Sequence, residues 1–215
     1  MKKNQTKTGS LLVGIGGGSC AGKSTLAGMV RGRLSPIKTE IVTCDRYYRP
    51  LDHLPLEKRH LQNFDSLEML DSALLAEHLS LLKAGMMAEM PVYDYRRHTR
   101  SPKPEPMTPP AVLLVEGILL FAVADLARLL DLKIYIEAEA DLRLARRIRR
   151  DRVERGRSVD SVLDQYFASV RPAHEKLVAP TRGLADLVVS GEEDPEKTAG
   201  RIVNLIRPMI NIQPC

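Results

Sequence analysis

The stretch that decides the fold is GGSCAGKS, residues 17–24. It matches the pattern G-x-x-x-x-G-K-[ST], in which glycines let successive backbone N–H groups turn toward phosphate oxygens. The apolar run LLVGIG, residues 11–16, stands before it, and a helical pattern over residues 24–34 follows. This pattern requires a strand before the turn and a helix after it, because the N-terminus of the helix also attracts anions. The stretch therefore predicts a binding site for a nucleoside triphosphate.

The same loop predicts roles for single residues. We expect Lys23 to reach the β- and γ-phosphates and the Ser24 hydroxyl to be a ligand of Mg²⁺. A glycine-rich turn with an incidental lysine is the alternative, and the flanking strand and helix argue against it. The residues expected to contact ATP in this loop are Gly17, Gly18, Ser19, Cys20, Ala21, Gly22, Lys23, Ser24 and Thr25.

Outward from this loop, strands and helices alternate. Besides residues 11–16, short apolar strands are predicted at 39–44, 111–115, 131–137 and 186–190. Further helices are predicted at 67–83, 140–155, 159–171 and 195–207. The proline-rich residues 101–110 are predicted to be a surface connection, because proline fits neither a helix nor a central strand. The alternation indicates an α/β protein whose parallel sheet is covered on both faces.

The composition is that of an ordinary globular protein, 44% hydrophobic and 27% charged over 215 residues. We expect one domain over residues 11–215 and a disordered tail over residues 1–10, which lack the apolar centre of a signal peptide. No apolar run approaches the roughly 20 residues that span a bilayer, so no membrane partner is expected. The cysteines, Cys20, Cys44 and Cys215, have no metal-binding spacing, and reduced thiols indicate a cytoplasmic protein.

Two carboxylates are expected at the carboxyl edge of the sheet. Asp45 follows the strand at 39–44, and Glu116 follows the apolar strand at 111–115. The chain lacks the N-K-x-D motif with which a GTPase reads its base, so a small kinase is the favoured class. Asp45 is then the candidate to accept the proton of the acceptor hydroxyl, and Glu116 the candidate to lie near Mg²⁺. A capping aspartate and a plain loop glutamate are the alternatives.

Positive charge is concentrated in RLARRIRRDRVERGR, residues 143–157, within a net charge of +5. This run fits a lid over the triphosphate, a solvated helix face or a nucleic-acid-binding surface. No aromatic residue lies in the run to stack on bases, and Gly156 marks a hinge. We therefore favour an arginine-rich lid over about residues 141–165 and expect no nucleic-acid partner. Helical spacing places Arg143, Arg147 and Arg150 on one face, so these are the better candidates to point inward.

A second unusual stretch is PVYDYRRHTR, residues 91–100, which holds two of the six tyrosines. Tyr93 and Tyr95 are two residues apart, so in an extended segment their rings project from one face, where a base can stack. His98 can hydrogen-bond the edge of that base. A β-hairpin whose rings pack into the core is the alternative.

Together these segments resemble the uridine kinases, also called uridine–cytidine kinases, within the phosphoribulokinase/uridine kinase group. The resemblance covers about residues 11–191. The order PVYDY..H.R, EGIL and RRI.RD..ERGR is far more specific than the phosphate loop alone. The resemblance implies a P-loop NTPase fold with a five-stranded parallel sheet, a small nucleoside-binding hairpin at about residues 88–100 and the helical lid.

The resemblance also implies transfer of the γ-phosphoryl group of ATP, with Mg²⁺, to the 5′-hydroxyl of uridine and of cytidine. Asp45 and Lys23 would be the catalytic residues, Asp65 would bind the ribose hydroxyls, and Arg150 would reach the ATP phosphates. Homotetramers are common in the family. The remaining nucleoside contacts that the resemblance implies are Tyr93, Tyr95, His98, Arg147, Arg157 and Gln165.

Several residues depart from the family pattern. Arg46 stands where serine usually follows the catalytic aspartate, and Ser66-Leu67 replaces a usual His-Pro after Asp65. These departures leave two alternatives open. One is a kinase of another, anionic acceptor, as in phosphoribulokinases, and the other is a catalytically silent nucleotide-binding regulator. The other departures are Cys20, Tyr95, Arg96 and Arg97.

Overall fold

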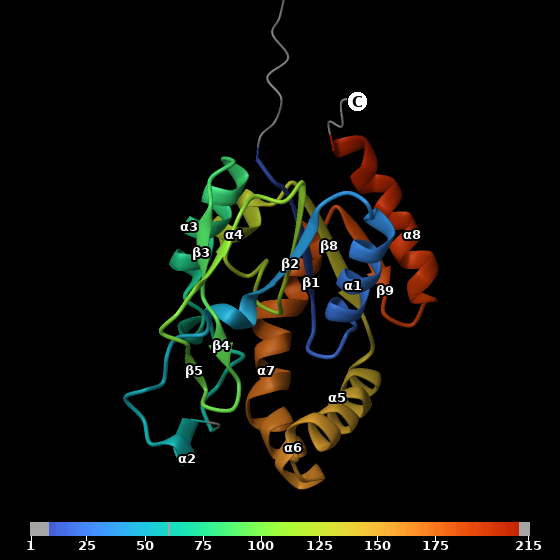
Figure 1. The fold of residues 1–215 in the computed structure, drawn as a ribbon. Coiled ribbons are helices and arrows are strands. Elements are labelled where there is room, and N and C mark those ends of the chain that lie inside the picture. Colours follow the sequence, from blue (N-terminus) through green and yellow to red (C-terminus); the bar gives the residue numbers. More distant parts are fainter. Residues whose placement is uncertain (1–8, 60, 211–215) are drawn as a thin grey trace, which may run out of the picture.

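The computed structural model describes residues 9–59 and 61–210, and one parallel five-stranded sheet forms its centre (Figure 1). The strand order is β2-β7-β1-β8-β9, which confirms the predicted sheet. Each strand begins and ends within one residue of its prediction. The strands are β1 Leu11–Gly17, β2 Thr39–Thr43, β7 Val112–Glu116, β8 Leu132–Glu137 and β9 Leu187–Ser190.

Helices cover both faces of this sheet, because neighbouring side chains of a buried strand point to opposite faces. Leu12 of β1 packs into one core, under α3 (Ser72–Lys83) and α4 (Ala124–Leu129). Leu11, Val13 and Ile15 pack into the other, under α1 (Lys23–Leu34) and α8 (Pro195–Ile206). Figure 1 shows these two helix pairs on opposite sides of the sheet.

Parallel pairing brings the carboxyl ends of the strands to one edge of the sheet. β1 ends there in the phosphate loop, β7 ends at Glu116, and β2 passes into a short 3₁₀ turn, η1 (Cys44–Tyr47). Asp45 therefore lies in this turn and not on the strand itself. The fold places the three chain segments with the expected chemistry at the same edge.

Two short ribbons stand beside this edge. β3 (Ala88–Met90) pairs with β6 (Glu105–Met107), and β4 (Tyr93–Asp94) pairs with β5 (Thr99–Arg100). The expected hairpin at 88–100 thus continues into the proline-rich segment, which is not only a connection. Pro106 is tolerated in β6 because this strand has a partner on one side only.

The lid region begins with α5 (Ala140–Arg155). Gly156 ends this helix with a left-handed backbone, φ 63°, and α6 (Val159–Gln165) follows. The predicted helix at 159–171 continues instead as two π-helical turns, η3 (Tyr166–Val170) and η4 (His174–Val178), on either side of α7 (Arg171–Ala173). A 3₁₀ turn, η5 (Ala179–Leu184), leads into β9. Figure 1 shows α5 and α6 across the carboxyl edge of the sheet.

The predicted helix at 67–83 is divided in two. A 3₁₀ turn, η2 (Leu67–Met69), precedes α3, because the Asp71 side chain accepts a hydrogen bond from the N–H of Leu74 and begins the helix there. The remaining short elements are α2 (Leu56–Arg59) and η6 (Arg207–Met209).

Residues 1–8 of the expected tail lie outside the described residues, whereas Ser10 is buried and its N–H donates to the carbonyl of Leu82. Within residues 9–59 and 61–210, no helix is long and apolar enough to cross a membrane.

Candidate active site

The phosphate loop joins β1 to α1 and has the backbone that its sequence predicts. Gly17 and Gly22 have φ angles of 135° and 110°, a region that side chains disfavour, and a Cβ on Gly17 would meet the Ile136 carbonyl at 2.4 Å. The ammonium of Lys23 is buried and donates to the carbonyls of Gly17 and Gly18 at 3.1 and 2.8 Å. Burial lowers the pKa of Lys23, and the nearby carboxylates Glu116 and Asp45 oppose that shift.

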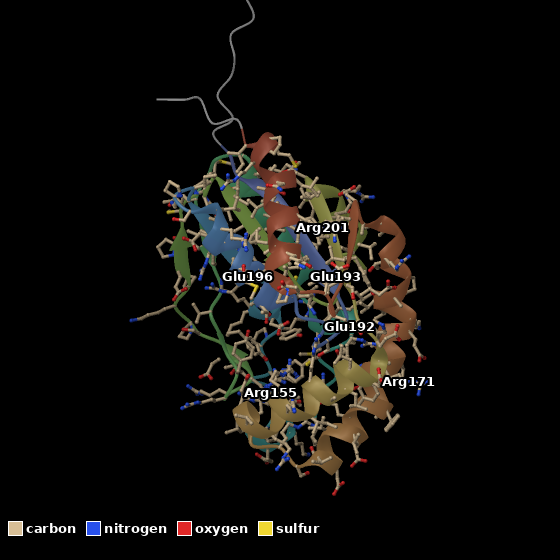
Figure 2. The ribbon with its side chains drawn as sticks, turned by 90° about the vertical axis from the view of Figure 1, so that its right-hand side faces the viewer. Arg155, Arg171, Glu192, Glu193, Glu196 and Arg201 are labelled. Carbon is tan, nitrogen blue, oxygen red and sulfur yellow. The ribbon has the colours of Figure 1, made fainter. Side chains whose placement is uncertain are left out.

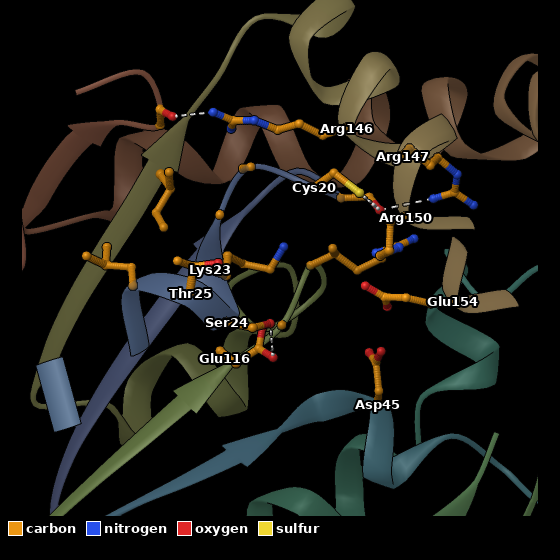
Figure 3. Close-up of a pocket in the computed structure, with 18 of the residues that line it drawn as sticks. Cys20, Lys23, Ser24, Thr25, Asp45, Glu116, Arg146, Arg147, Arg150 and Glu154 are labelled. Atoms are coloured by element: carbon orange, nitrogen blue, oxygen red, sulfur yellow. Dashed lines mark hydrogen bonds between the residues drawn. The ribbon is translucent and has the colours of Figure 1, made fainter. Parts of the chain in front are cut away.

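Ser24 and Glu116 meet at the end of β7, as the predicted metal ligands should. The Ser24 hydroxyl donates to Oε1 of Glu116 at 3.0 Å, a contact drawn in Figure 3. Burial raises the pKa of Glu116, and the positive charge of Lys23 opposes that rise. The carboxyl is therefore largely shielded from solvent and lies close to a cation. A hydroxyl and a carboxylate are hard oxygen donors, so these two residues fit Mg²⁺. Among the described residues, no cluster of three or more His, Cys, Asp or Glu suits a metal held by protein alone.

Asp45 faces the phosphate loop from η1. Its N–H donates to Oγ1 of Thr43 at 3.3 Å, which holds the turn directly after β2. Figure 3 shows its carboxylate opposite Lys23, Glu116 and Arg150. Burial raises the pKa of Tyr48 well above its usual value, and both the charge of Asp45 and a hydrogen bond to its carboxylate add to the rise. Asp45 thus lies between the phosphate loop and a wall of aromatic rings.

The aromatic wall is a chain of neighbouring rings. Tyr95 lies 5.3 Å from Tyr93, and Tyr93 lies 5.7 Å from Tyr48, between ring centroids. Tyr48 lies 5.2 Å from Phe64, and Phe64 lies 5.3 Å from His98. Sequence reasoning predicted Tyr93, Tyr95 and His98 at this site. It did not assign Tyr48 and Phe64, although an aromatic residue three positions after Asp45 and another directly before Asp65 were a signal for both.

Two polar groups complete this wall. Asp65 is buried, which raises its pKa, and the guanidinium of Arg147 opposes the rise. The hydroxyl of Tyr93 is buried without a hydrogen-bond partner among the described residues. A buried donor without a partner costs free energy, so this hydroxyl is a candidate to meet a ligand.

Arg46 does not place its charge at the acceptor side of the site. Its Nε donates to the carbonyl of Pro91 at 2.7 Å, and its Nη2 donates to Glu105 at 2.8 Å. It lines a separate small hollow beside the β3–β6 ribbon. The position of Arg46 therefore gives no support to a different, anionic acceptor, since its side chain connects η1 to the ribbons.

The lid arginines approach from the opposite side. Arg147 donates to the Ser19 hydroxyl at 3.0 Å and to Gln165 at 2.8 Å, and Arg157 donates to the same Gln165 oxygen at 2.6 Å. The expectation for Arg143 is wrong. Its guanidinium lies behind Gly18 and donates to the carbonyl of Ala138, so the phosphate loop itself blocks its way inward.

The phosphate loop, the two carboxylates, the aromatic wall and the inward-facing lid arginines surround one cavity of about 1530 Å³. It is lined by every predicted site residue except Gly17 and Gly18, at the start of the loop, and Arg143. The cavity also reaches segments that sequence reasoning did not assign. They include Arg146, Glu154 and Arg155 of the lid, together with residues 189–195 and Thr198 near the start of α8. Figure 2 shows Glu192 and Glu193 at this end, with Arg155 on the lid helix below.

Known proteins resemble this chain in sequence and in fold. The model of the phosphoribulokinase/uridine kinase family matches residues 12–196. A uridine kinase of Chloroflexus aurantiacus is 45% identical over 181 residues, which cover 84% of this chain and 87% of that protein. A uridine kinase of Alkaliphilus metalliredigens is 39% identical over 200 residues, covering 93% and 96%. The structure of phosphoribulokinase from Rhodobacter spheroides has the same fold, with a TM-score of 0.64 at 18% identity, over 88% of this chain and 74% of that one.

Proposed function

This chain belongs to the phosphoribulokinase/uridine kinase family, and from that membership we propose that it transfers the γ-phosphoryl group of ATP to the 5′-hydroxyl of uridine and of cytidine. One observation carries the proposal. A single cavity joins a phosphate loop, the carboxylate of Asp45 and an aromatic wall. The wall offers several rings on which a base can stack, and Asp45 lies between the wall and the phosphate loop, where the acceptor hydroxyl would approach.

Each residue of the site has a separate role in the phosphoryl transfer. Asp45 accepts or orients the proton of the 5′-hydroxyl as its oxygen approaches the γ-phosphorus. Lys23 and the lid guanidiniums of Arg147 and Arg150 stabilise the negative charge of the transferring group. The lid covers the cavity and excludes water, which would otherwise compete with the nucleoside for the phosphoryl group.

Mg²⁺ would be held by the Ser24 hydroxyl, with Glu116 near it, and would neutralise part of the negative charge of the triphosphate. On the acceptor side, Asp65 would accept hydrogen bonds from the ribose hydroxyls, since a carboxylate can receive two donors at once. The remaining nucleoside contacts would come from Tyr93, Tyr95, His98, Arg157 and Gln165.

The test is a coupled ADP-release assay with ATP and Mg²⁺, in which uridine, cytidine, ribulose 5-phosphate and pantothenate are offered separately. Turnover with the two nucleosides alone supports the proposal. Turnover with ribulose 5-phosphate alone would favour the anionic acceptor in its place. Asp45→Asn should lower turnover at least about a hundredfold while MgATP still binds. The matched control is Asp125→Asn, an exposed aspartate of α4 outside the cavity, which should keep turnover. Near-normal turnover of Asp45→Asn would remove Asp45 from the mechanism.

We also propose a cytoplasmic homo-oligomer, a tetramer by the family resemblance. The side chains of Met86 and Met87, before β3, are more than half exposed and are apolar surface that such an assembly would cover. Light scattering after size exclusion gives the mass directly, and a monomer at micromolar concentration would contradict this assembly.

A further inference from the structure

Asp151 is the acid at the centre of the arginine-rich lid. Its carboxylate is completely buried, and it lies in α5 among four arginine side chains. Oδ1 is 2.9 Å from Nη2 of Arg150 and 3.6 Å from Nη1 of Arg155. Oδ2 is 3.3 Å from Nη1 of Arg157 and 3.8 Å from Nε of Arg147. A buried carboxylate requires partners of this kind, so its place and theirs depend on each other.

The four arginines line the active-site cavity, whereas Asp151 does not. Figure 3 shows Arg147 and Arg150 extending from the lid helix toward the phosphate loop. One carboxylate set against four guanidiniums leaves an excess of positive charge on the cavity side. Without the carboxylate, the four like charges would repel one another and spread into solvent. Asp151 thus acts on any bound anion through the arginines and not by contact.

Asp151 also connects the two sides of the lid hinge. Its backbone carbonyl accepts from the N–H groups of Gly156 and Arg157, which closes α5 at the hinge. Its side chain contacts Arg147 before the hinge and Arg157 after it, and both arginines donate to the same oxygen of Gln165. Asp151, Arg147, Gln165 and Arg157 therefore form a closed ring of polar contacts across α5 and α6. Such a ring fixes the angle between the two helices.

We propose that Asp151 is a positioning residue. It holds the lid arginines in the arrangement that binds the triphosphate on one side and, through Gln165, the acceptor on the other. This inference rests on the proposed function of the site as a kinase. A residue outside the cavity would thus position both the lid groups that contact the triphosphate and those that contact the acceptor.

The test uses Asp151→Asn, which keeps the shape but removes the charge and turns one acceptor into a donor. Asp151→Glu keeps the charge, and Asp160→Asn changes an exposed acid of α6 outside the cavity. The readouts are kcat, the two KM values, and the affinity for Mg²⁺ with a non-hydrolysable ATP analogue, all taken well below the melting temperature of each variant. For Asp151→Asn we expect kcat to fall at least tenfold and the analogue to bind at least fivefold more weakly. Asp151→Glu should recover part of both losses, and Asp160→Asn should match the wild type.

A double-mutant cycle with Arg157→Ala separates positioning from a general loss of stability. If Asp151 acts through Arg157, the charge removal should cost much less in the Arg157→Ala background than in the wild type. Equal losses in both backgrounds, unchanged kinetics, or tighter analogue binding by Asp151→Asn would overturn the inference. The analogue measurement needs no acceptor. If the wild-type protein did not phosphorylate uridine, the proposed function would be refuted, but the analogue measurement would still test the role of Asp151.

Discussion

The hydroxyl of Tyr93 gives a prediction in which stability and binding change in opposite directions. This hydroxyl is buried without a hydrogen-bond partner among the described residues, and burial raises the pKa of Tyr93 to about 12. A buried donor without a partner costs about 1–3 kcal/mol. Tyr93→Phe should therefore raise the free energy of unfolding of the free protein by about 1 kcal/mol. For a domain of this size, that corresponds to an increase in Tm of about 2–4 °C.

The same change should weaken uridine binding. If the hydroxyl bonds the nucleoside, its loss costs about 1 kcal/mol, or about fivefold in Kd. Uridine at about 100 times the wild-type Kd stabilises the wild type by about 2.7 kcal/mol and the variant by only about 1.8 kcal/mol. The advantage of the variant, about 1 kcal/mol without uridine, should therefore almost vanish when uridine is added.

Thermal unfolding with and without uridine measures both effects in one experiment. The matched control is Tyr47→Phe, because the hydroxyl of Tyr47 is 3.0 Å from Nδ1 of His78 and lies outside the cavity. That variant should lose stability, by about 1 kcal/mol, and keep its affinity for uridine. A Tyr93→Phe variant that is less stable than the wild type in the absence of uridine would refute the reasoning, since the hydroxyl would then have a partner in the free protein. Unchanged uridine affinity would show that the nucleoside does not supply one.

Three further predictions concern residues around the site. Arg46→Ser removes the connection between η1 and the ribbons, so the KM for uridine should rise about threefold to tenfold in steady-state assays while the KM for ATP stays within twofold. Iodoacetamide should inactivate the protein through Cys20, a half-buried thiol that lines the cavity, and MgATP should protect it. Cys20→Ser should be resistant, and equal inactivation of that variant would locate the damage elsewhere. Burial lowers the pKa of His174 to about 4, so this imidazole binds fewer protons in the folded chain than in the unfolded chain between about pH 6.5 and 4. The stability that His174 contributes should fall as pH drops through that window. In urea titrations, His174→Gln should therefore lose less stability than the wild type over this range, whereas the exposed His53→Gln should behave like the wild type.

Much of the fold could be predicted because the strands are short, apolar and separated by clear helical patterns. Every strand of the main sheet lies within one residue of its prediction. The division of the helix predicted at 67–83 was harder to foresee, because its leucine spacing continues through Leu70 while the cap that begins the helix is Asp71. Strand β6 was missed because Pro106 argues against a central strand. That β6 pairs on one side only, which makes the proline acceptable, cannot be read from the local sequence.

The site shows the same division between local pattern and three-dimensional packing. The phosphate loop, Asp45 and Glu116 were predictable because their positions after strands of a parallel sheet bring them to one edge. Arg143 was misplaced because helical spacing gives the face of a helix but not what lies against it, here the back of the phosphate loop at Gly18. The direction of Arg46 depends on contacts with Pro91 and Glu105, 45 and 59 residues away in the sequence, which no local pattern reveals.

The two π-helical turns between the lid and β9 have a consequence for how this segment tolerates changes in length. A π turn is an α-helical turn that has absorbed one additional residue, so its flanking residues keep their places although the chain between them is longer. The segment from Gln165 in the cavity to Val178 in the core contains two such turns in succession. The segment therefore contains two residues more than an α-helix joining the same two ends would contain. Loss of one residue from either turn would convert it to ordinary α-helix and leave both ends where the fold needs them.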